Sequence, residues 1–170
     1  EVLNSIVNKS KIKFGLDLVV GKTYTALLTT SSIAKAQRYY LLLKEIKEGK
    51  SKIQISENVK KSVPDFPKFA ITYSVSENED GSVVNQEKMN EAIDDYNRQF
   101  GTRFSLETIK AYNADINERL ARKQEKYQYR KEQIDIVIVV DRLLTGFDAP
   151  CLSTLFIDRA PMRPHDLIKA

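Results

Sequence analysis

Runs of β-branched apolar residues mark the strands expected in this 170-residue chain. The clearest lies within residues 134–140, where Ile136 to Val140 contains no polar residue, a pattern typical of a strand covered on both faces of a parallel sheet. Further strands are expected at residues 24–30, 52–56, 69–75 and 153–158. Because helical segments alternate with these strands, the predicted fold class is α/β, with a doubly wound, mainly parallel sheet.

Apolar residues at intervals of three and four positions mark the first helices. A short helix is expected over residues 2–7. A longer one should begin after Ser31 or Ser32 as the N-cap and run to about Glu48, where Gly49 closes it. The apolar side chains of this helix expected to face the sheet are Ile33, Ala36, Tyr40 and Leu43.

Two further helical stripes follow in the second half of the chain. The first begins near Gln86 and is stopped by Gly101, and the second is capped by Ser105. Their apolar positions are Met89, Ile93, Tyr96 and Phe100, and then Ile109, Tyr112, Ile116 and Leu120. These stripes predict a helical insertion over about residues 86–130 within one domain that comprises residues 1–170.

The stretch from Arg119 to Arg130 is densely charged. The interpretation we favour is a solvent-facing surface, because mixed charge runs are usually solvated. The alternative is that its clustered Lys and Arg side chains contact phosphates.

Polar residues follow the strand at residues 134–140. Thr145 offers a hydroxyl, Gly146 permits backbone angles closed to other residues, and Asp148 can accept from ribose hydroxyls or orient an arginine. Since ligands bind beyond the carboxyl ends of parallel strands, these three are the first candidates for chemistry. The alternative is a tight turn whose carboxylate caps the next segment.

A second polar group ends the strand at residues 24–30. Thr30, Ser31 and Ser32 lie where a strand gives way to a helix, so their hydroxyls and the unpaired N–H groups of the helix can bind an anion. Plain N-capping is the alternative, and the two roles are compatible. Gly21 and Lys22 do not form a P-loop, because position 16, where that motif needs a glycine, is Leu16.

Three segments resemble, in order, those of the motor subunit of type I restriction enzymes, the R subunit. Residues 25–40 resemble motif IV of that family, and residues 69–80 resemble the segment after it. Residues 139–158, with residues 164–170, resemble helicase motif V and the start of motif VI. The resemblance implies a RecA-like second motor lobe of a superfamily 2 translocase.

The resemblance also implies roles for the candidate residues. Gly146 and Asp148 would face an ATP site between two lobes, with ATP and Mg²⁺ bound mainly by a first lobe outside this chain. The residues implied in DNA binding are Thr30, Ser31, Ser32, Thr145 and Gly146. The motif VI arginines would follow Ala170, so the chain is expected to be a fragment that is inactive in isolation.

Partners follow from the same resemblance. They would be double-stranded DNA, the first motor lobe and nuclease domain of the same chain, and the methyltransferase and specificity subunits, in the bacterial cytoplasm. The alternatives are the second lobe of another superfamily 2 DNA or RNA helicase, and a non-catalytic protein-interaction module.

Composition excludes few of these possible functions. The net charge of +4 permits contact with a polyanion without requiring it. No apolar run approaches the length of a membrane span, and no signal peptide is recognisable. With one cysteine, Cys151, and one histidine, His165, neither an internal disulfide nor a His-pair metal site is expected.

Overall fold

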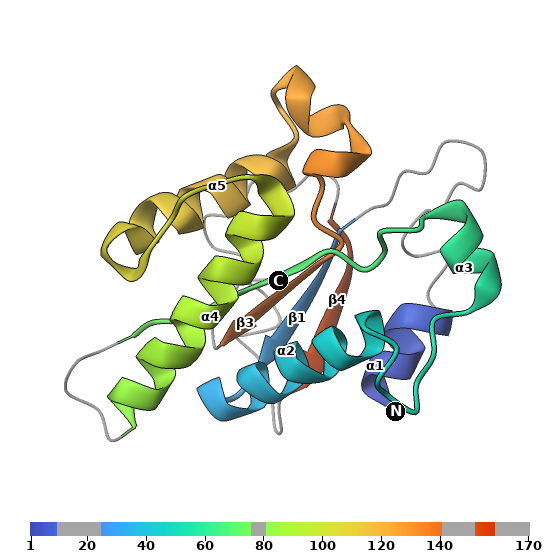
Figure 1. Ribbon diagram of the computed structural model, residues 1–170, viewed down its shortest axis with the longest axis horizontal. Helices are drawn as coiled ribbons and strands as arrows, with labels where there is room; N and C mark the ends of the chain where they lie inside the picture. The colour runs from blue at the N-terminus through green and yellow to red at the C-terminus, as the bar shows by residue number, and fades with distance from the viewer. Residues whose placement is uncertain (10–24, 76–80, 141–151, 159–170) are drawn as a thin grey trace, which may run out of the picture.

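The computed structural model describes residues 1–9, 25–75, 81–140 and 152–158, whose strands form one parallel sheet (Figure 1). The order of the strands across the sheet is β2-β3-β1-β4. Their bounds are Thr25–Thr30 for β1, Phe69–Thr72 for β2, Ile136–Val140 for β3 and Leu152–Asp158 for β4. The predicted fold class is confirmed: the chain has an α/β, RecA-like fold with a parallel sheet between helical layers.

The central strands are covered on both faces, as their sequences predict. Every residue of β1 is buried, and so are the first four residues of β3. In the register between them, Leu28 of β1 pairs with Ile138 of β3. Side chains of successive residues point to opposite faces, so a strand with no exposed residue needs a layer on each side.

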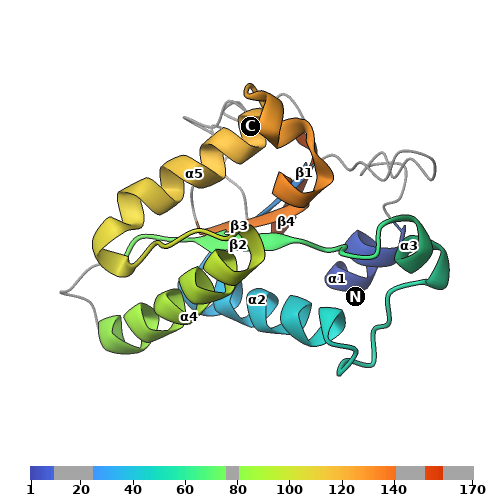
Figure 2. The same cartoon turned by 45° about the horizontal axis from the view of Figure 1, so that its top comes forward.

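Helices supply both layers (Figure 2). On one face lie α2, Ile33–Lys47, and α4, Ser82–Phe100, and on the other lies α5, Ile109–Ala121. Side chains of β2 show the same division. The ring of Phe69 packs edge-on against that of Tyr40 in α2, with ring centres 5.2 Å apart. Thr72, three residues further along β2, instead donates a hydrogen bond to Asn113 of α5.

The remaining elements are short. Near the start of the chain, α1, Val2–Asn4, continues into a π-helical turn, Ser5–Lys9. A two-turn helix, α3, spans Glu57–Ser62, and 3₁₀ turns span Leu106–Thr108, Glu125–Gln128 and Arg130–Glu132. None of the helices among the described residues is long and apolar enough to cross a membrane.

Most expected elements are confirmed, with shifts at their ends. The long helix starts after Ser32 and ends before Gly49, which adopts the left-handed conformation expected of a closing glycine. The first of the two later helices begins at Ser82, four residues before the expected start, because Gly81 at φ +86° redirects the chain there. The apolar stripe begins only at Met89, so periodicity alone missed the first turns.

The strand expected at residues 52–56 is wrong. This segment contains bends and no ladder, and it leads into α3. Its backbone is paired by a side chain instead: the amide of Asn8 donates to the carbonyl of Gln54 at 2.8 Å and accepts from the N–H of Ser56 at 3.0 Å. One asparagine therefore takes the place of a neighbouring strand.

The region expected as a helical insertion folds as α4 and α5, which meet beside the edge strand β2. Tyr96 of α4 and Tyr112 of α5 are both buried, with ring centroids 4.9 Å apart and Phe104 beside them. Tyr112 also donates a hydrogen bond of 2.7 Å to the carbonyl of Ile71 in β2. The two helices thus close the edge of the sheet from both faces.

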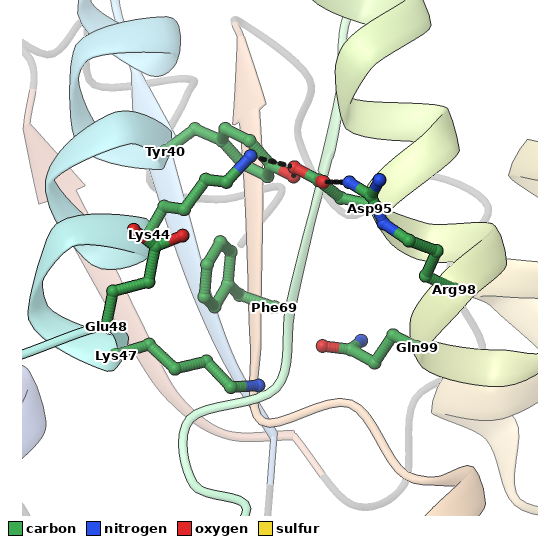
Figure 3. Close-up of a pocket in the computed structure, with 8 residues that line it drawn as sticks. All are labelled: Tyr40, Lys44, Lys47, Glu48, Phe69, Asp95, Arg98 and Gln99. Carbon is green, nitrogen blue, oxygen red and sulfur yellow. Dashed lines mark hydrogen bonds and ion pairs between the residues drawn. The ribbon is translucent and has the colours of Figure 1, made fainter.

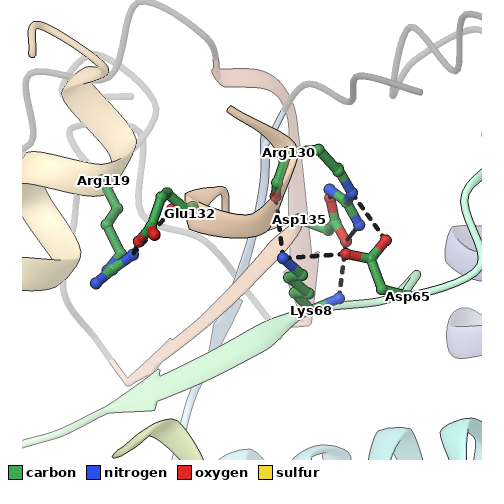
Figure 4. A network of polar contacts seen from close by, with 6 residues as sticks. All are labelled: Asp65, Lys68, Arg119, Arg130, Glu132 and Asp135. Carbon is green, nitrogen blue, oxygen red and sulfur yellow. Dashed lines mark hydrogen bonds and ion pairs between the residues drawn. The ribbon is translucent and has the colours of Figure 1, made fainter. Parts of the chain in front are cut away.

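The solvent-facing interpretation of residues 119–130 is wrong for Arg119, which is buried, and for Arg130, which is partly buried (Figure 4). The side chain of Arg119 is 4% exposed; it pairs with Asp115 at 2.8 Å and Glu132 at 2.7 Å, and its guanidinium lies 4.0 Å from the centre of the Phe100 ring. The aromatic rings and carboxylates together offset the cost of burying the Arg119 guanidinium, a charged group that the sequence alone predicts to be solvent-exposed.

Arg130 belongs to a second polar network, which lies at the amino ends of the strands and is only partly buried (Figure 4). It pairs with Asp135, whose buried carboxylate also accepts the backbone N–H of Lys68 at 2.7 Å. Asp65 pairs with both Arg130 and Lys68, at 3.0 Å each. This network joins the start of β2 to the start of β3.

Replacing Arg119 tests whether its pairs stabilise the fold. Arg119→Ala leaves Asp115 and Glu132 largely buried without their cation, so we expect the free energy of unfolding to fall by about 3 kcal/mol. Urea denaturation measures the change. The exposed Arg103 is the matched control, and Arg103→Ala should change stability by no more than about 0.5 kcal/mol. Equal effects of the two substitutions would contradict the structural role of Arg119.

Candidate functional site at the carboxyl edge of the sheet

The carboxyl ends of three strands meet at one edge of the sheet (Figure 1). Thr30, the last residue of β1, pairs with Val140 at the end of β3 and with Asp158 at the end of β4. A parallel sheet places every carboxyl end on the same side, and this is the side on which such sheets bind ligands. Within the described residues, the carboxyl ends of β1, β3 and β4 therefore lie side by side.

Thr30 turns its hydroxyl into the protein. The residue is fully buried, and the hydroxyl lies 3.1 Å from the carbonyl oxygen of Ser32 and 3.4 Å from that of Val139. Its hydrogen bonds hold the turn between β1 and α2 rather than facing solvent. The buried position follows from the parallel neighbours on both sides of β1.

Ser31 and Ser32 are exposed at the start of α2. Ser32 has extended backbone angles and accepts a hydrogen bond from the N–H of Lys35 at 3.2 Å, so the N-cap expected from the sequence is confirmed. The cap uses one N–H of the first turn. The others point out of the helix end, where a helix carries partial positive charge and favours an anion.

Asp158 ties β4 to the first half of α2. Tyr39 donates to one carboxylate oxygen of Asp158 at 2.5 Å, and the ammonium of Lys35 lies 3.1 Å from the other. The hydrogen bond from Tyr39 and the charge of Lys35 hold the pKa of Asp158 below its usual range. Burial and the hydrogen bond to Asp158 raise the pKa of Tyr39 to about 12.

A second polar cluster holds the other flank of α2. The buried amide of Gln37 donates to the hydroxyl of Tyr73 at 2.9 Å and to the side chain of Asn85 at 3.0 Å. The Tyr73 hydroxyl donates in turn to the carbonyl of Asn85 at 2.8 Å. Tyr73 directly follows β2, so this cluster also lies near a strand end and joins α2 to the start of α4.

The other candidates lie outside the described residues. Thr145, Gly146 and Asp148 belong to residues 141–151, which follow β3 along the chain. The structure therefore brings together Thr30, Ser31 and Ser32 and shows the strand that leads to the second group. Within the described part of the chain, no group of three or more His, Cys, Asp or Glu side chains is arranged to hold a metal ion.

Sequence reasoning missed the anchoring residues Lys35 and Tyr39, which hold Asp158. A signal was available, because residues four apart on a helix share one face, and Lys35 and Tyr39 have this spacing. Their common partner is more than a hundred positions away in the sequence, so its identity required the fold.

Removing the Tyr39 hydroxyl tests the link between α2 and β4. We expect Tyr39→Phe to lower the free energy of unfolding by about 1 kcal/mol at neutral pH, because a hydrogen bond to a partly exposed carboxylate is lost. The pKa of Asp158 is lowered in the folded state, so its contribution is present above the unfolded pKa and disappears as the pH falls through the folded value. Thermal unfolding from pH 7 to pH 3 should show the difference from the unsubstituted chain shrinking with acidity.

The exposed Tyr129 provides the matched control for this series. Tyr129→Phe should leave stability unchanged across the same pH range. A Tyr39→Phe deficit that stayed constant down to pH 3 would contradict the proposed contribution of the charged Asp158.

Comparison with known proteins places the chain in a family. Residues 22–170 match the family described as type I restriction enzyme subunit R domain 3. The type I restriction enzyme SauMRSORF196P endonuclease subunit of Staphylococcus aureus is 34% identical over 152 residues, which cover 88% of this chain and 14% of that protein. The SsaAORF53P endonuclease subunit of Staphylococcus saprophyticus is likewise 34% identical, covering 88% of this chain and 15% of that protein.

A shorter match, 40% identical over 47 residues, is to the HindI endonuclease subunit of Haemophilus influenzae. It covers 28% of this chain and 4% of that protein. The chain thus spans about one seventh of the length of the staphylococcal relatives. On the match of the family model and the staphylococcal identities, this chain belongs to the type I restriction enzyme R subunit family, in the region of its domain 3.

Proposed function

We propose that this chain is the second motor lobe of an ATP-dependent translocase on double-stranded DNA, within the endonuclease subunit of a type I restriction enzyme. The family match and the names of the relatives support the parent enzyme. The RecA-like parallel sheet, with its strand ends gathered at one edge, supports a role as a motor lobe. We also propose that the parent protein works in the bacterial cytoplasm, where DNA is available as its substrate.

DNA contact is proposed at the start of α2. The observation that carries this proposal is the exposed pair Ser31 and Ser32 at a helix N-terminus on the ligand-binding edge of the sheet. Hydroxyls and outward N–H groups are suitable donors to a phosphate of the DNA backbone. Thr30 supports the contact from below, since its buried hydroxyl holds the turn in place.

Two anchors keep this helix end fixed relative to the sheet. On one flank Lys35 and Tyr39 hold Asp158, and on the other Gln37 holds Tyr73. A binding group on a rigid element loses little conformational freedom when a ligand arrives. The arrangement suits a motor that transmits force between DNA and the protein.

The ATP site is proposed to lie between this lobe and another part of the same subunit. ATP and Mg²⁺ would be bound mainly by that first lobe, and this chain would contribute Gly146 and Asp148 after β3. A glycine admits a close approach of the ligand to the backbone, and Asp148 is suited to accept from ribose or to orient an arginine. Thr145 and Gly146 would extend the DNA contact begun by Ser31 and Ser32.

In the proposed cycle, closing of the two lobes on ATP strengthens the grip on one DNA strand, and hydrolysis releases it. The nuclease domain of the same chain would cut the DNA. The methyltransferase and specificity subunits would supply recognition of the site. Each of these partners lies outside the 170 residues.

Introducing a carboxylate at the cap tests the DNA contact. Aspartate also caps helices, so Ser32→Asp should retain the stability of α2, while its charge repels phosphate. We expect the full-length subunit to bind duplex DNA about tenfold more weakly at low salt, with a smaller deficit at high salt. Fluorescence anisotropy at several salt concentrations measures both effects.

Ser51, four residues beyond the C-terminal end of α2, provides a control. Its hydroxyl also accepts a local backbone N–H, from Ile53 at 3.1 Å. Ser51→Asp should leave DNA affinity unchanged. Equal losses for the two substitutions would indicate a general charge effect and contradict a contact at Ser32.

Asp148 is tested in the full-length subunit by Asp148→Ala. We expect DNA-stimulated ATP hydrolysis to fall by about a hundredfold or more, because a group placed at the transferring phosphate or its arginine contributes several kcal/mol to the transition state. Circular dichroism should show a folded protein. Normal stimulation in this variant would remove Asp148 from the site.

A further inference from the structure

The first turns of α2 carry basic side chains and no acidic ones. Residues 31–44 contain Lys35, Arg38 and Lys44 but neither Asp nor Glu. The N-terminal end of a helix already carries partial positive charge, so cations near it are not favoured by the helix itself. Together they suit an anion, and the partners of each cation decide which of them is available to bind it.

Lys35 and Lys44 have carboxylate partners within the protein. The ammonium of Lys35 lies 3.1 Å from Asp158, and that of Lys44 lies 2.8 Å from Asp95. Figure 3 shows the second pair, in which Asp95 of α4 reaches across to α2. Each of these two lysines is therefore largely neutralised by its own partner.

Arg38 has no such partner. The residue is exposed, and it makes no ion pair or hydrogen bond with any residue that the structure describes. The carboxylate of Asp158 is already held by Lys35 and by the hydroxyl of Tyr39. The start of α2 thus presents two cations for one carboxylate, and Arg38 supplies the excess positive charge.

The position of Arg38 relates it to the cap of the helix. Arg38 and the exposed Ala34 are four residues apart, so they share the solvent-facing side of α2. At a rise of about 1.5 Å per residue, the backbone of Arg38 lies about 9 Å along the axis from Ser32. Side chains of a helix lean toward its N-terminus, which directs the guanidinium of Arg38 back toward the cap.

An anion with several charges in a row fits this arrangement. One strand of duplex DNA carries a phosphate about every 3.4 Å along the axis of the duplex. A strand with one phosphate at Ser32 therefore has a further phosphate within reach of Arg38. A guanidinium is suited to this contact, because it can donate two parallel hydrogen bonds to one phosphate.

We propose that Arg38 binds a phosphate of the DNA strand that the start of α2 contacts, beyond the phosphate at Ser31 and Ser32. Lys35, although closer to the cap, is committed to Asp158 and does not bind DNA. The inference rests on the proposed contact between DNA and the start of α2. It adds the residue that supplies charge to a site whose other donors, hydroxyls and backbone N–H groups, are neutral.

The experiment measures how the affinity of the full-length subunit for duplex DNA depends on salt. Each phosphate neutralised by a cation contributes about 0.9 to the slope of log affinity against log salt concentration, because counterions are released. We expect Arg38→Gln to reduce this slope by about one and to weaken binding about tenfold at low salt, equally for duplexes of different sequence. Arg38→Lys should keep the slope, because it keeps the charge, and should lose less affinity.

Two control variants separate this contact from the general charge of the protein. Arg103→Gln removes an exposed arginine between α4 and α5, and it should change neither the slope nor the affinity. Lys35→Gln should leave the slope unchanged, because the ammonium of Lys35 is held by Asp158. Melting temperatures equal to that of the unsubstituted subunit exclude misfolding as a cause for Arg38→Gln.

Four outcomes overturn the proposal. They are an unchanged slope for Arg38→Gln, an equal change for Arg103→Gln, a change for Lys35→Gln in place of Arg38→Gln, and a raised KM for ATP with an unchanged slope, which would assign Arg38 to the nucleotide. If Ser32→Asp weakens DNA binding while Arg38→Gln leaves the slope unchanged, only the assignment of Arg38 fails. If neither variant has an effect, the proposed DNA contact of α2 fails with it.

Discussion

A parallel sheet has to be covered on both faces, and the arrangement of this protein follows from that requirement. The buried strands β1 and β3 have no side available to water, so α2 and α4 cover one face and α5 the other. The aromatic contact between Tyr96 and Tyr112 closes the layers around β2. With the strands parallel, their carboxyl ends reach a single edge, where Ser31 and Ser32, proposed to contact DNA, lie.

Helix α2 is linked to several other elements of the molecule. Its first residues present Ser31 and Ser32 at the carboxyl edge, and its last turn presents Lys47 near the start of β2. Between these ends, the helix is fixed to β4 through Asp158 and to the segment after β2 through Tyr73. The end of α2 that is proposed to contact DNA is therefore fixed to two neighbouring parts of the sheet.

The basic side chains of this chain differ in whether they are paired within the protein, although the net charge is only +4. Arg119 and Arg130 form ion pairs with carboxylates of the protein, and Arg119 also packs against the ring of Phe100. These two arginines therefore do not form a surface for phosphates. Lys47 makes no direct ion pair with a described residue, although the carboxylates of Asp135 and Asp65 act on its charge. The distribution of paired and unpaired cations is therefore more informative about binding than their number.

The local sequence was sufficient to predict strands β1, β3 and β4, the long helix with its Ser32 cap, and the polar residues at the strand ends. Burial on both faces, helical periodicity and N-capping each produce a pattern that can be recognised within a few neighbouring residues. Distant partners decided the rest. Asn8 pairs the backbone of residues 52–56 in place of a strand, and carboxylates from other segments pair with Arg119 and Arg130. A hydrogen bond or ion pair between residues far apart in the chain has no local signature, so these features arise only when the fold brings the partners together.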